Sequence, residues 1–312
     1  MPSNQFLWHE KMNKRALITG GTGFIGGSVA RHLIETGWSV DLIIRKESDL
    51  SSIEDVLTTS TSHIYDGSTE SLVSIVKKVR PDAVFHLASL VQVRHEQSDI
   101  VPLIMSNVVF GTQLLEAMVS AKVNTLVNAA TIWQYSGGDE RQAVNLYAAT
   151  KQSFESIIDY YHDAFGVSAV SLVLSDTYGV GDRRKKLINF LICSVGEGAV
   201  LNMSPGDQII DLSHVQDVAR SFELVACKLI ESVKPVRESL AISGTRLSVK
   251  QLVAAVESVS QQKVNVEFGG RPYRAREIMC PAQLPELAPE WRRIELSDGI
   301  QELLDVYRKK LL

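Results

Sequence analysis

The sequence shows no excess of basic residues, no long unbroken apolar run and no leader-like pattern in its first ten residues. Its 312 residues include 32 Lys and Arg against 36 Asp and Glu, a net charge of −4, so no nucleic-acid partner is expected. No apolar run approaches the roughly 18 residues that cross a membrane, so no membrane partner is expected. Residues 1–10 show no basic stretch followed by an apolar one, which argues against a secretory signal.

Cysteine is scarce as well. Cys193, Cys227 and Cys280 are widely spaced and odd in number. They match neither a disulfide framework nor a Cys-x-x-Cys metal site, so no metal is expected. The simplest interpretation is a reducing compartment, and we predict a cytoplasmic protein.

What the chain does contain is an alternation of short apolar strands and amphipathic helices up to about residue 175. The first expected helix carries Ile25, Val29 and Leu33 on one stripe and ends at Gly37. Such alternation predicts the α/β class, with a Rossmann-type, doubly wound parallel sheet. The expected strands are 15–19, 40–44, 82–87, 124–129 and 168–174.

Three regions follow from this pattern. Residues 1–14 are expected to be a polar N-terminal extension, and residues 15–175 a dinucleotide-binding domain. Beyond that the alternation is lost, so residues 176–312 are expected to form mainly a smaller α/β substrate-binding region. Part of 208–243 is expected to return to the sheet and to supply its last strand near Leu240–Ser243.

The first expected strand runs directly into a glycine-rich turn that opens a helix. The segment Thr19 to Gly26 reads TGGTGFIG, with glycines at three-residue spacing. Glycines in this context permit a tight turn and close backbone approach, and the helix N-terminus then faces a pyrophosphate. The alternative is a purely structural turn. The expected cofactor contacts here are Gly20, Thr22, Gly23, Phe24, Ile25 and Gly26.

The end of the second expected strand bears on the choice of cofactor. NAD enzymes of this fold usually place an acidic residue there for the ribose 2′-hydroxyl. Here the strand ends in Ile43-Ile44-Arg45-Lys46. Because a basic side chain pairs with a 2′-phosphate, NADP(H) is favoured, with Arg45 as the leading contact and Lys46 beside it. NAD(H) is the alternative if both are merely solvated charges.

Two further pairs of residues carry site hypotheses. Asp66 suits a hydrogen bond to the adenine amino group, with Gly67 beside it as a further cofactor contact, or else Asp66 is a turn residue. Tyr147 and Lys151 lie four residues apart in an expected helix, so their side chains share one face. A nearby ammonium favours the phenolate, which makes Tyr147 a candidate acid or base near neutral pH. This spacing is common on solvated helices, so the hypothesis depends on its combination with the glycine signature.

These features resemble the extended short-chain dehydrogenase/reductases, in their nucleotide-sugar epimerase/dehydratase group, over nearly the whole chain. The resemblance implies a nicotinamide cofactor over the C-terminal edge of the sheet. In that pattern Asn107 supports the active site, and Lys151 binds the nicotinamide ribose and lowers the pKa of Tyr147. The residues that would line the cofactor groove are Leu87, Ala88 and Ser89. The matching motifs are Thr19–Gly26, Asp66, Phe85–Ser89, Asn107–Thr112, Tyr147 with Lys151, Leu174–Gly179 and Asp211–Asp217.

A closer likeness, to the CDP-abequose and CDP-paratose synthases, implies reduction of the 4-keto group of a CDP-3,6-dideoxyhexulose. The usual Ser/Thr partner of the Tyr falls on Ala129, which has no hydroxyl. Thr131, two residues along the strand, projects to the same side and is expected to replace it. The alternative is a strand-end Thr without a catalytic role. This likeness rests on Thr131–Gln134, Asn145–Lys151, Asp176–Gly179 and Arg271–Glu277.

The same stretch argues against dehydration. Sugar 4,6-dehydratases of the family carry an Asp-Glu pair just after the catalytic Thr, and those positions are Ala130 and Thr131 here. Without the two carboxylates, the sequence offers no evident acid/base pair for the loss of water.

The implied substrate is anionic through its diphosphate, which Arg binds bidentately. The sequence contains two clusters of basic residues that could bind this diphosphate. We expect the contacts to come from Arg183 in the first cluster and from Arg271 and Arg274 in the second. Asp176 stands where the family has an Asn that contacts the sugar nucleotide, and it is carried over as a substrate contact. The alternative is that both clusters are solvated surface. The full clusters are Arg183, Arg184, Lys185 and Lys186, then Arg271, Arg274 and Arg276.

The sequence therefore predicts an NADPH-dependent 4-ketoreductase of a nucleotide-linked deoxy sugar, in surface-polysaccharide biosynthesis. Tyr147 would donate the proton and Thr131 would hold the carbonyl. One alternative is an NAD-dependent nucleotide-sugar epimerase, which returns the hydride to the same sugar. Another is a non-catalytic regulator that senses a dinucleotide. A homodimer through the segments 103–121 and 146–164 is implied by the resemblance.

Overall fold

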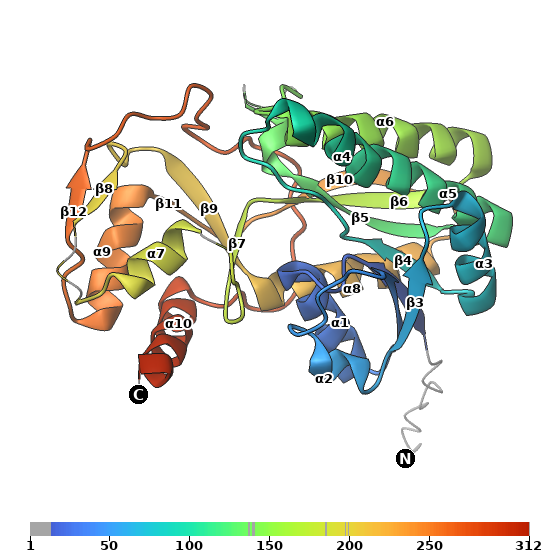
Figure 1. Ribbon diagram of the computed structural model, residues 1–312, viewed down its shortest axis with the longest axis horizontal. Coiled ribbons are helices and arrows are strands. Elements are labelled where there is room, and N and C mark those ends of the chain that lie inside the picture. Colours follow the sequence, from blue (N-terminus) through green and yellow to red (C-terminus); the bar gives the residue numbers. More distant parts are fainter. Residues whose placement is uncertain are drawn as a thin grey trace, which may run out of the picture.

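The computed structural model describes residues 14–136, 138, 141–184, 186–196, 198 and 200–311, without the side chains of residues 310 and 311. The expected N-terminal extension lies outside these residues except for Lys14, and so does Lys185 of the first basic cluster. Figure 1 shows a large lobe around a parallel sheet and a smaller lobe, which the chain enters as it leaves the C-terminal ends of two strands.

Seven parallel strands form the sheet of the large lobe, which confirms the predicted doubly wound fold. Two central strands are buried along their whole length, as expected where helices cover both faces. The sequence pattern does not reveal the edge strand β3, because only His63 of its five residues is buried. In spatial order the strands are β10 (Arg237–Ile242), β6 (Ser168–Leu174), β5 (Thr125–Thr131), β4 (Ala83–His86), β1 (Arg15–Thr19), β2 (Ser39–Arg45) and β3 (Thr61–Tyr65).

Helices pack on both faces of this sheet (Figure 1). On one face Val29 and Leu33 of α1 share a buried cluster with Val218 and Phe222 of α8. Each apolar side chain buried in this way contributes about 1.5–3 kcal/mol to folding. The helices of this face are α1 (Phe24–Glu35), α2 (Glu54–Leu57) and α8 (Val215–Glu231), and those of the other are α3 (Thr69–Val79), α5 (Phe110–Ala121) and α6 (Leu146–Phe165).

The segment Gln97–Ala121 is one continuous helix of 25 residues, long and apolar enough to cross a membrane by length and composition. Polar residues interrupt it, so it contains no unbroken apolar run of the length considered above, and it passes this test through a mean hydropathy of 1.4. A single such helix is weak evidence for a membrane span, and this one packs against α3 and α6. Its parts are η1 (Gln97–Asp99), α4 (Ile100–Ile104), the π-helical η2 (Met105–Val109) and α5.

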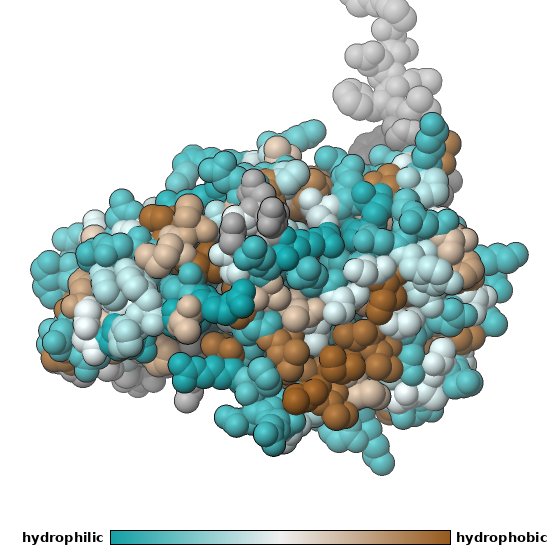
Figure 2. Space-filling view, turned by 90° about the horizontal axis from the view of Figure 1, so that it is seen from above, coloured by the Kyte–Doolittle hydropathy of each residue, from teal (hydrophilic) through white to brown (hydrophobic). Residues whose placement is uncertain are grey.

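The outer side of this long helix is apolar at its start. Figure 2 shows apolar side chains gathered on one face of the large lobe. The exposed apolar residues on α4 and at the first position of η2 are Ile100, Val101, Ile104 and Met105. A contiguous exposed apolar surface commonly marks a site of protein association.

The smaller lobe has its own apolar core, centred on residues such as Leu191, Leu252 and Ile300. Its two small sheets and three helices surround that core (Figure 1). The three-stranded sheet contains β11 (Thr245–Ser248), β9 (Ile209–His214) and β7 (Asp176–Tyr178), and the two-stranded sheet contains β12 (Val266–Phe268) and β8 (Leu201–Met203). The helices are α7 (Leu187–Cys193), α9 (Val249–Ser260) and α10 (Leu296–Leu311).

A buried carboxylate fixes the place where the chain passes from the large sheet to the small lobe. Asp211 of β9 accepts hydrogen bonds from Ser243 Oγ at 2.8 Å, the Gly244 backbone N at 2.7 Å and Arg246 Nε at 3.0 Å. A Cβ at Gly244 would overlap the backbone of Leu212, so only glycine fits this crossing. The bonds hold the small lobe against the C-terminal edge of the sheet, where the site lies.

Candidate active site

The glycine turn between β1 and α1 provides a backbone cradle. Gly20 has a φ of +73°, and a Cβ on it would lie 2.5 Å from the backbone N of Ala88. A Cβ on Gly26 would overlap the carbonyl oxygen of Gly20. Gly23 caps α1 without a side-chain hydrogen bond, and the first turn contains no acidic residue. The N–H groups at this helix end are therefore available to an anion.

Beside the cradle lies a groove of about 500 Å³, here called the adenosine half of the cleft. Arg45, exposed at the end of β2, lines it and is the single charged residue among the described lining residues. Lys46 is exposed and does not line it. The predicted residues in its wall are Gly20, Thr22, Gly23, Arg45, Gly67, Leu87, Ala88 and Ser89.

Asp66 does not line this groove. Its Oδ1 accepts hydrogen bonds from the backbone N of Ser68 at 2.9 Å and from Ser68 Oγ at 2.7 Å. These bonds hold the pKa of the exposed Asp66 carboxyl below its usual value. The geometry is that of a turn residue before α3, the alternative that the sequence left open.

The apolar wall of the adenosine half was not predicted from the sequence. The rings of Tyr65 and Phe110 pack against each other with centroids 4.9 Å apart and a tilt of 51°, and Pro102 and Met105 of the long helix complete the wall. An apolar wall of this kind suits an aromatic base. No local motif marks these residues, because strand β3 and the long helix meet only in the folded chain.

The second cavity, about 270 Å³, is here called the reacting half. It shares Gly20, Gly23, Leu87 and Ser89 with the adenosine half, so the two form one cleft. The residues that line it come from both lobes and include Phe24, Ile25, Gly26, Ala129, Thr131, Trp133, Tyr147, Lys151, Asp176, Arg184 and Lys186.

Tyr147 lies in the first turn of α6, buried in the reacting half. Asn145 caps this helix by accepting a hydrogen bond from the Ala148 N at 2.9 Å, and its Nδ2 donates to the carbonyls of Gln92 and Val93 at 3.2 Å. Because of these bonds, the start of α6 is tied to the loop that follows Ser89. Burial raises the pKa of Tyr147 above its usual value, and hydrogen bonds with Ser89 and Thr131 and the positive charge of Arg184 offset this only in part. The structure thus does not show the lowered Tyr147 pKa that the resemblance implies.

Lys151 lies one turn further along α6 and is also buried. Burial lowers its pKa from 10.5 to about 8, against an opposing effect of the Glu155 carboxylate. Neighbouring His86 is fully buried, and burial together with the Lys151 charge lowers its pKa to about 3. His86 Nδ1 lies 2.8 Å from Thr19 Oγ1, so this His remains neutral and structural.

Thr131 lies where β5 ends and η3 (Ile132–Gln134) begins. Its Oγ1 accepts the Trp133 N–H at 3.3 Å, and its own N–H donates to Gln134 Oε1 at 3.0 Å. This capping box fixes a hydroxyl beside Tyr147, whereas Ala129 presents only a methyl group to the cleft.

Asn107 is buried in the π-helical turn η2. Its Oδ1 accepts from Ser89 Oγ at 3.1 Å and from the Leu90 N at 2.8 Å. Its Nδ2 donates to the Leu90 carbonyl and to Thr150 Oγ1, both at 2.9 Å. Asn107 thus joins the long helix, the loop after β4 and α6, and it orients the Ser89 hydroxyl beside Tyr147. Such π-helical turns are frequent at functional sites.

The smaller lobe brings charged side chains into the reacting half. Lys186 Nζ lies 3.1 Å from Asp176 Oδ1, and both line the cleft. Arg184 also lines it and lies over the ring of Phe24, 4.9 Å from the ring centroid. From the first basic cluster, the structure therefore brings Arg184 and Lys186 to the cleft.

Three predicted substrate contacts lie elsewhere. Arg183 does not line the cleft but donates to Ser51 Oγ at 3.2 Å. Arg271 and Arg274 are exposed on the segment after β12 and line neither half. Arg274 lies 3.9 Å from Glu277. A role for Arg271 and Arg274 would therefore require the segment to move toward the cleft.

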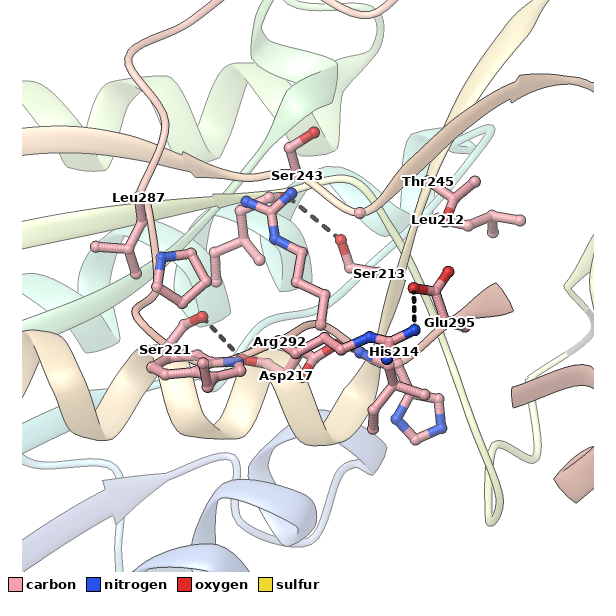
Figure 3. A pocket seen from close by; sticks show the side chains of 16 residues that line it. Leu212, Ser213, His214, Asp217, Ser221, Ser243, Thr245, Leu287, Arg292 and Glu295 are labelled. Atoms are coloured by element: carbon pink, nitrogen blue, oxygen red, sulfur yellow. Dashed lines mark hydrogen bonds and ion pairs between the residues drawn. The ribbon is translucent and has the colours of Figure 1, made fainter. Parts of the chain in front are cut away.

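A separate cavity of about 220 Å³ lies between α8, the start of β11 and residues 287–295 (Figure 3). It contains none of the predicted site residues. Arg292 pairs with Glu295 at 3.0 Å, and Asp217 accepts the Ile294 N–H at 2.8 Å. The cavity is therefore lined by polar contacts where the two lobes meet. Among the described residues, no group of His, Cys, Asp or Glu could hold a metal ion.

The NAD dependent epimerase/dehydratase family model matches residues 16–235, more than half of the chain. The chain belongs to this family. This confirms the extended short-chain dehydrogenase/reductase resemblance and places the glycine cradle in a nicotinamide-dependent fold.

Relatives and solved structures agree with this placement. The chain is 27% identical to CDP-abequose synthase of Yersinia pseudotuberculosis, covering 86% of this chain and 91% of the relative. It is 24% identical to CDP-abequose synthase of Salmonella typhimurium, covering 94% and 98%. The UDP-glucose 4-epimerase of Brucella ovis in complex with NAD superposes with a TM-score of 0.81 at 22% identity, covering 94% and 98%. At that identity the structure shows the shared fold.

The cleft fits a nicotinamide dinucleotide. The cradle at Gly20 and Gly26 leaves no room for a Cβ, and the end of α1 offers unpaired N–H groups to a pyrophosphate. On one side the groove ends at Arg45, and on the other it reaches Tyr147 and Lys151. These are the chain's own residues that would hold the two ends of such a cofactor.

Proposed function

We propose that this protein is an NADPH-dependent reductase of the 4-keto group of a nucleotide-linked deoxy sugar of the CDP-3,6-dideoxyhexose type, in surface-polysaccharide biosynthesis. The observation that carries the proposal is the placement of Tyr147, Thr131 and Lys151 in one cleft that continues into the dinucleotide groove. The similarity to two CDP-abequose synthases supports the choice of sugar nucleotide.

In this proposal a reduced nicotinamide, when bound, supplies a hydride for a carbonyl carbon. Thr131, fixed by its capping box, holds the carbonyl oxygen by a hydrogen bond, and Tyr147 donates a proton to that oxygen. Lys151 stabilises the resulting phenolate. Asn107 keeps the Ser89 hydroxyl beside Tyr147, which limits the positions that the phenol can adopt.

The composition of the reacting half supports reduction over dehydration. Elimination of water needs acid/base groups on the sugar carbons next to the carbonyl. Ala129 and Ala130 line this part of the cleft with methyl groups, and Asp176 is the single carboxylate among its described lining residues. Asp176 is already paired with Lys186, whose Nζ lies 3.1 Å from its Oδ1. We keep Asp176 as a proposed contact of the sugar nucleotide.

The choice of NADPH depends on Arg45. Its exposed guanidinium at the end of β2 suits a 2′-phosphate, which Arg binds through two hydrogen bonds. NAD(H) remains the alternative cofactor. An exchangeable NADPH distinguishes the reductase from an epimerase, which reuses a retained cofactor within each turnover.

The test is consumption of NADPH, followed by its absorbance, with a CDP-4-keto-3,6-dideoxyhexose made in situ. The expected result is stoichiometric oxidation of NADPH with loss of the keto group, and slower oxidation of NADH. Parallel reactions contain UDP-, GDP- and dTDP-linked keto-sugars. Conversion of an ordinary nucleotide hexose without added cofactor would instead identify an epimerase. Binding of the dinucleotide without turnover of any sugar would identify the regulator.

We also propose that the protein is a cytoplasmic homodimer. Its three cysteines are few, widely spaced and odd in number, which suits a reducing compartment. The interface is expected on the segments 103–121 and 146–164, and the exposed Ile104 on the first of them, with the exposed Ile100 and Val101 just before it, offers an apolar surface for a second copy (Figure 2). Light scattering after size-exclusion chromatography should show a dimer, and Val101→Glu should shift it to the monomer. A monomeric unaltered protein would refute this assembly.

A further inference from the structure

Residues 179–184 reach from the small lobe to the large one. They follow β7, and Figure 1 shows the connection between β7 and α7 extending toward α1. Two contacts join this segment to the large lobe. Arg183 Nη1 donates to Ser51 Oγ at 3.2 Å, and Arg184 lies over the ring of Phe24, the first residue of α1. The segment therefore crosses the cleft beside the N-terminus of α1, which follows the glycine cradle.

Arg184 is held in one orientation by a buried partner. The side chain of Asp182 is fully buried, and its carboxylate accepts from Arg184 Nε at 2.7 Å and from Nη2 at 2.8 Å. Nη2 also donates to the Thr177 carbonyl at 3.2 Å. A guanidinium bound by such a fork and stacked on an aromatic ring loses little further freedom on binding a ligand.

Part of this guanidinium remains available to the cleft. The Arg184 side chain is 42% exposed, and within the described part of the chain Nη1 has no hydrogen-bond partner. Of the two other cations that line the reacting half, Lys186 is already paired with Asp176, and Lys151 is buried. Arg184 is thus the cation in this cleft that combines a fixed position with an open hydrogen-bonding edge.

The opposite wall carries partial positive charge of its own. Gly23 and Phe24 line the same cavity as Arg184, and the N-terminus of α1 there has neither a side-chain cap nor an acidic residue in its first turn. A guanidinium and a helix N-terminus that flank one space are complementary to an anion between them.

We propose that Arg184 binds a pyrophosphate in the cleft, on the side opposite the N-terminus of α1. This inference rests on the proposed function, since both ligands of that reaction carry a pyrophosphate: the dinucleotide and the sugar nucleotide. Arg184 comes from the small lobe and the cradle from the large lobe, so the bound anion links the two lobes.

The test measures binding without turnover. NADPH affinity is measured by fluorescence titration in the absence of sugar nucleotide, and CDP affinity by calorimetry in the absence of cofactor. The variants are Arg184→Ala, Arg184→Lys and, as a control of equal charge loss, Arg308→Ala on the exposed surface of α10. Arg184→Ala should weaken one or both ligands about ten- to a hundredfold, the range for lost hydrogen bonds to a charged group. Arg184→Lys should give a smaller loss, because it keeps the charge without the fork.

The two titrations distinguish the sources of the pyrophosphate. Weakening of NADPH alone assigns Arg184 to the cofactor, and weakening of CDP alone assigns it to the sugar nucleotide. Unchanged affinity for both, or an equal loss in Arg308→Ala, would overturn the inference. An unaltered protein that binds NADPH but reduces no keto-sugar would refute the proposed function and leave the pyrophosphate result standing. Failure to bind either ligand would refute both.

Discussion

The two halves of the cleft are built differently. The adenosine half comes entirely from residues 20–110 of the large lobe, is mostly apolar, and has Arg45 as its single charged residue among those described. The reacting half is assembled from both lobes, up to Lys186, and contains buried Tyr147 and Lys151. The first half can recognise a cofactor by shape and one charge. The second changes the protonation behaviour of its side chains by burying them.

The sharpest test of this contrast is removal of the Tyr147 hydroxyl. Tyr147→Phe should lower kcat by about 10²- to 10⁴-fold, the usual contribution of a positioned general acid. NADPH affinity should stay nearly unchanged, because the adenosine half is untouched. Steady-state kinetics and a binding titration measure the two effects. Tyr160→Phe, exposed on the same helix, is the matched control. Undiminished turnover in Tyr147→Phe would remove this residue from the mechanism.

The converse test alters only the adenosine half. Arg45→Ala should weaken NADPH binding about ten- to a hundredfold through loss of charge-assisted hydrogen bonds to the 2′-phosphate. NADH lacks that phosphate, so its affinity should hardly change and serves as the internal control. The ratio of kcat/KM with NADPH to kcat/KM with NADH measures the cofactor preference of each variant. An equal loss of affinity for both cofactors would mean that Arg45 supports the structure of the groove and does not bind the 2′-phosphate.

The contrast also explains which parts of the site the sequence could predict. The glycine cradle is a local turn, so its spacing alone identifies it, and the helical spacing of Tyr147 and Lys151 is local too. Thr131 could be placed because two-residue spacing in a strand fixes the side on which a residue projects. The aromatic wall at Tyr65 and Phe110 joins residues 45 positions apart and has no local pattern.

Charged residues were the hardest to place from the sequence. Arg183 and Arg184 are neighbours, yet one reaches Ser51 outside the cleft and the other lies over Phe24 within it. Their directions depend on the turns around Gly179 and Gly181, which have φ values of +150° and +89°. Arg271 and Arg274 stay exposed because the segment after β12 lies away from both cavities. A run of basic residues in the sequence shows that positive charge is present, but it does not show which of the side chains reach the cleft.

Substitution of a residue that contacts both halves of the cleft should affect catalysis and cofactor binding together. Asn107 bonds Ser89, whose side chain borders both cavities, and Thr150, which lies on α6. Asn107→Ala removes its hydrogen bonds to the half-buried Ser89 and the buried Thr150 and should lower the free energy of unfolding by about 1–3 kcal/mol. It should also lower kcat and weaken NADPH binding together. Chemical denaturation and the assays above measure this. A change confined to kcat would assign Asn107 to the reacting half alone.

The smallest effect at neutral pH, and the most specific, concerns Lys151. Burial lowers its pKa to about 8, whereas in the unfolded chain it is near 10.5. Between these values the unfolded chain binds more protons, so the stability of the protein should rise with pH from about 8 to 10.5.

Over the same window kcat/KM should fall, because deprotonated Lys151 no longer stabilises the Tyr147 phenolate. Lys151→Met should abolish both trends, and Tyr160→Phe should keep them. Opposite slopes for stability and activity are not expected of a solvated lysine, whose pKa is the same folded and unfolded. Parallel slopes would therefore show that Lys151 acts on folding and not on the proton of Tyr147.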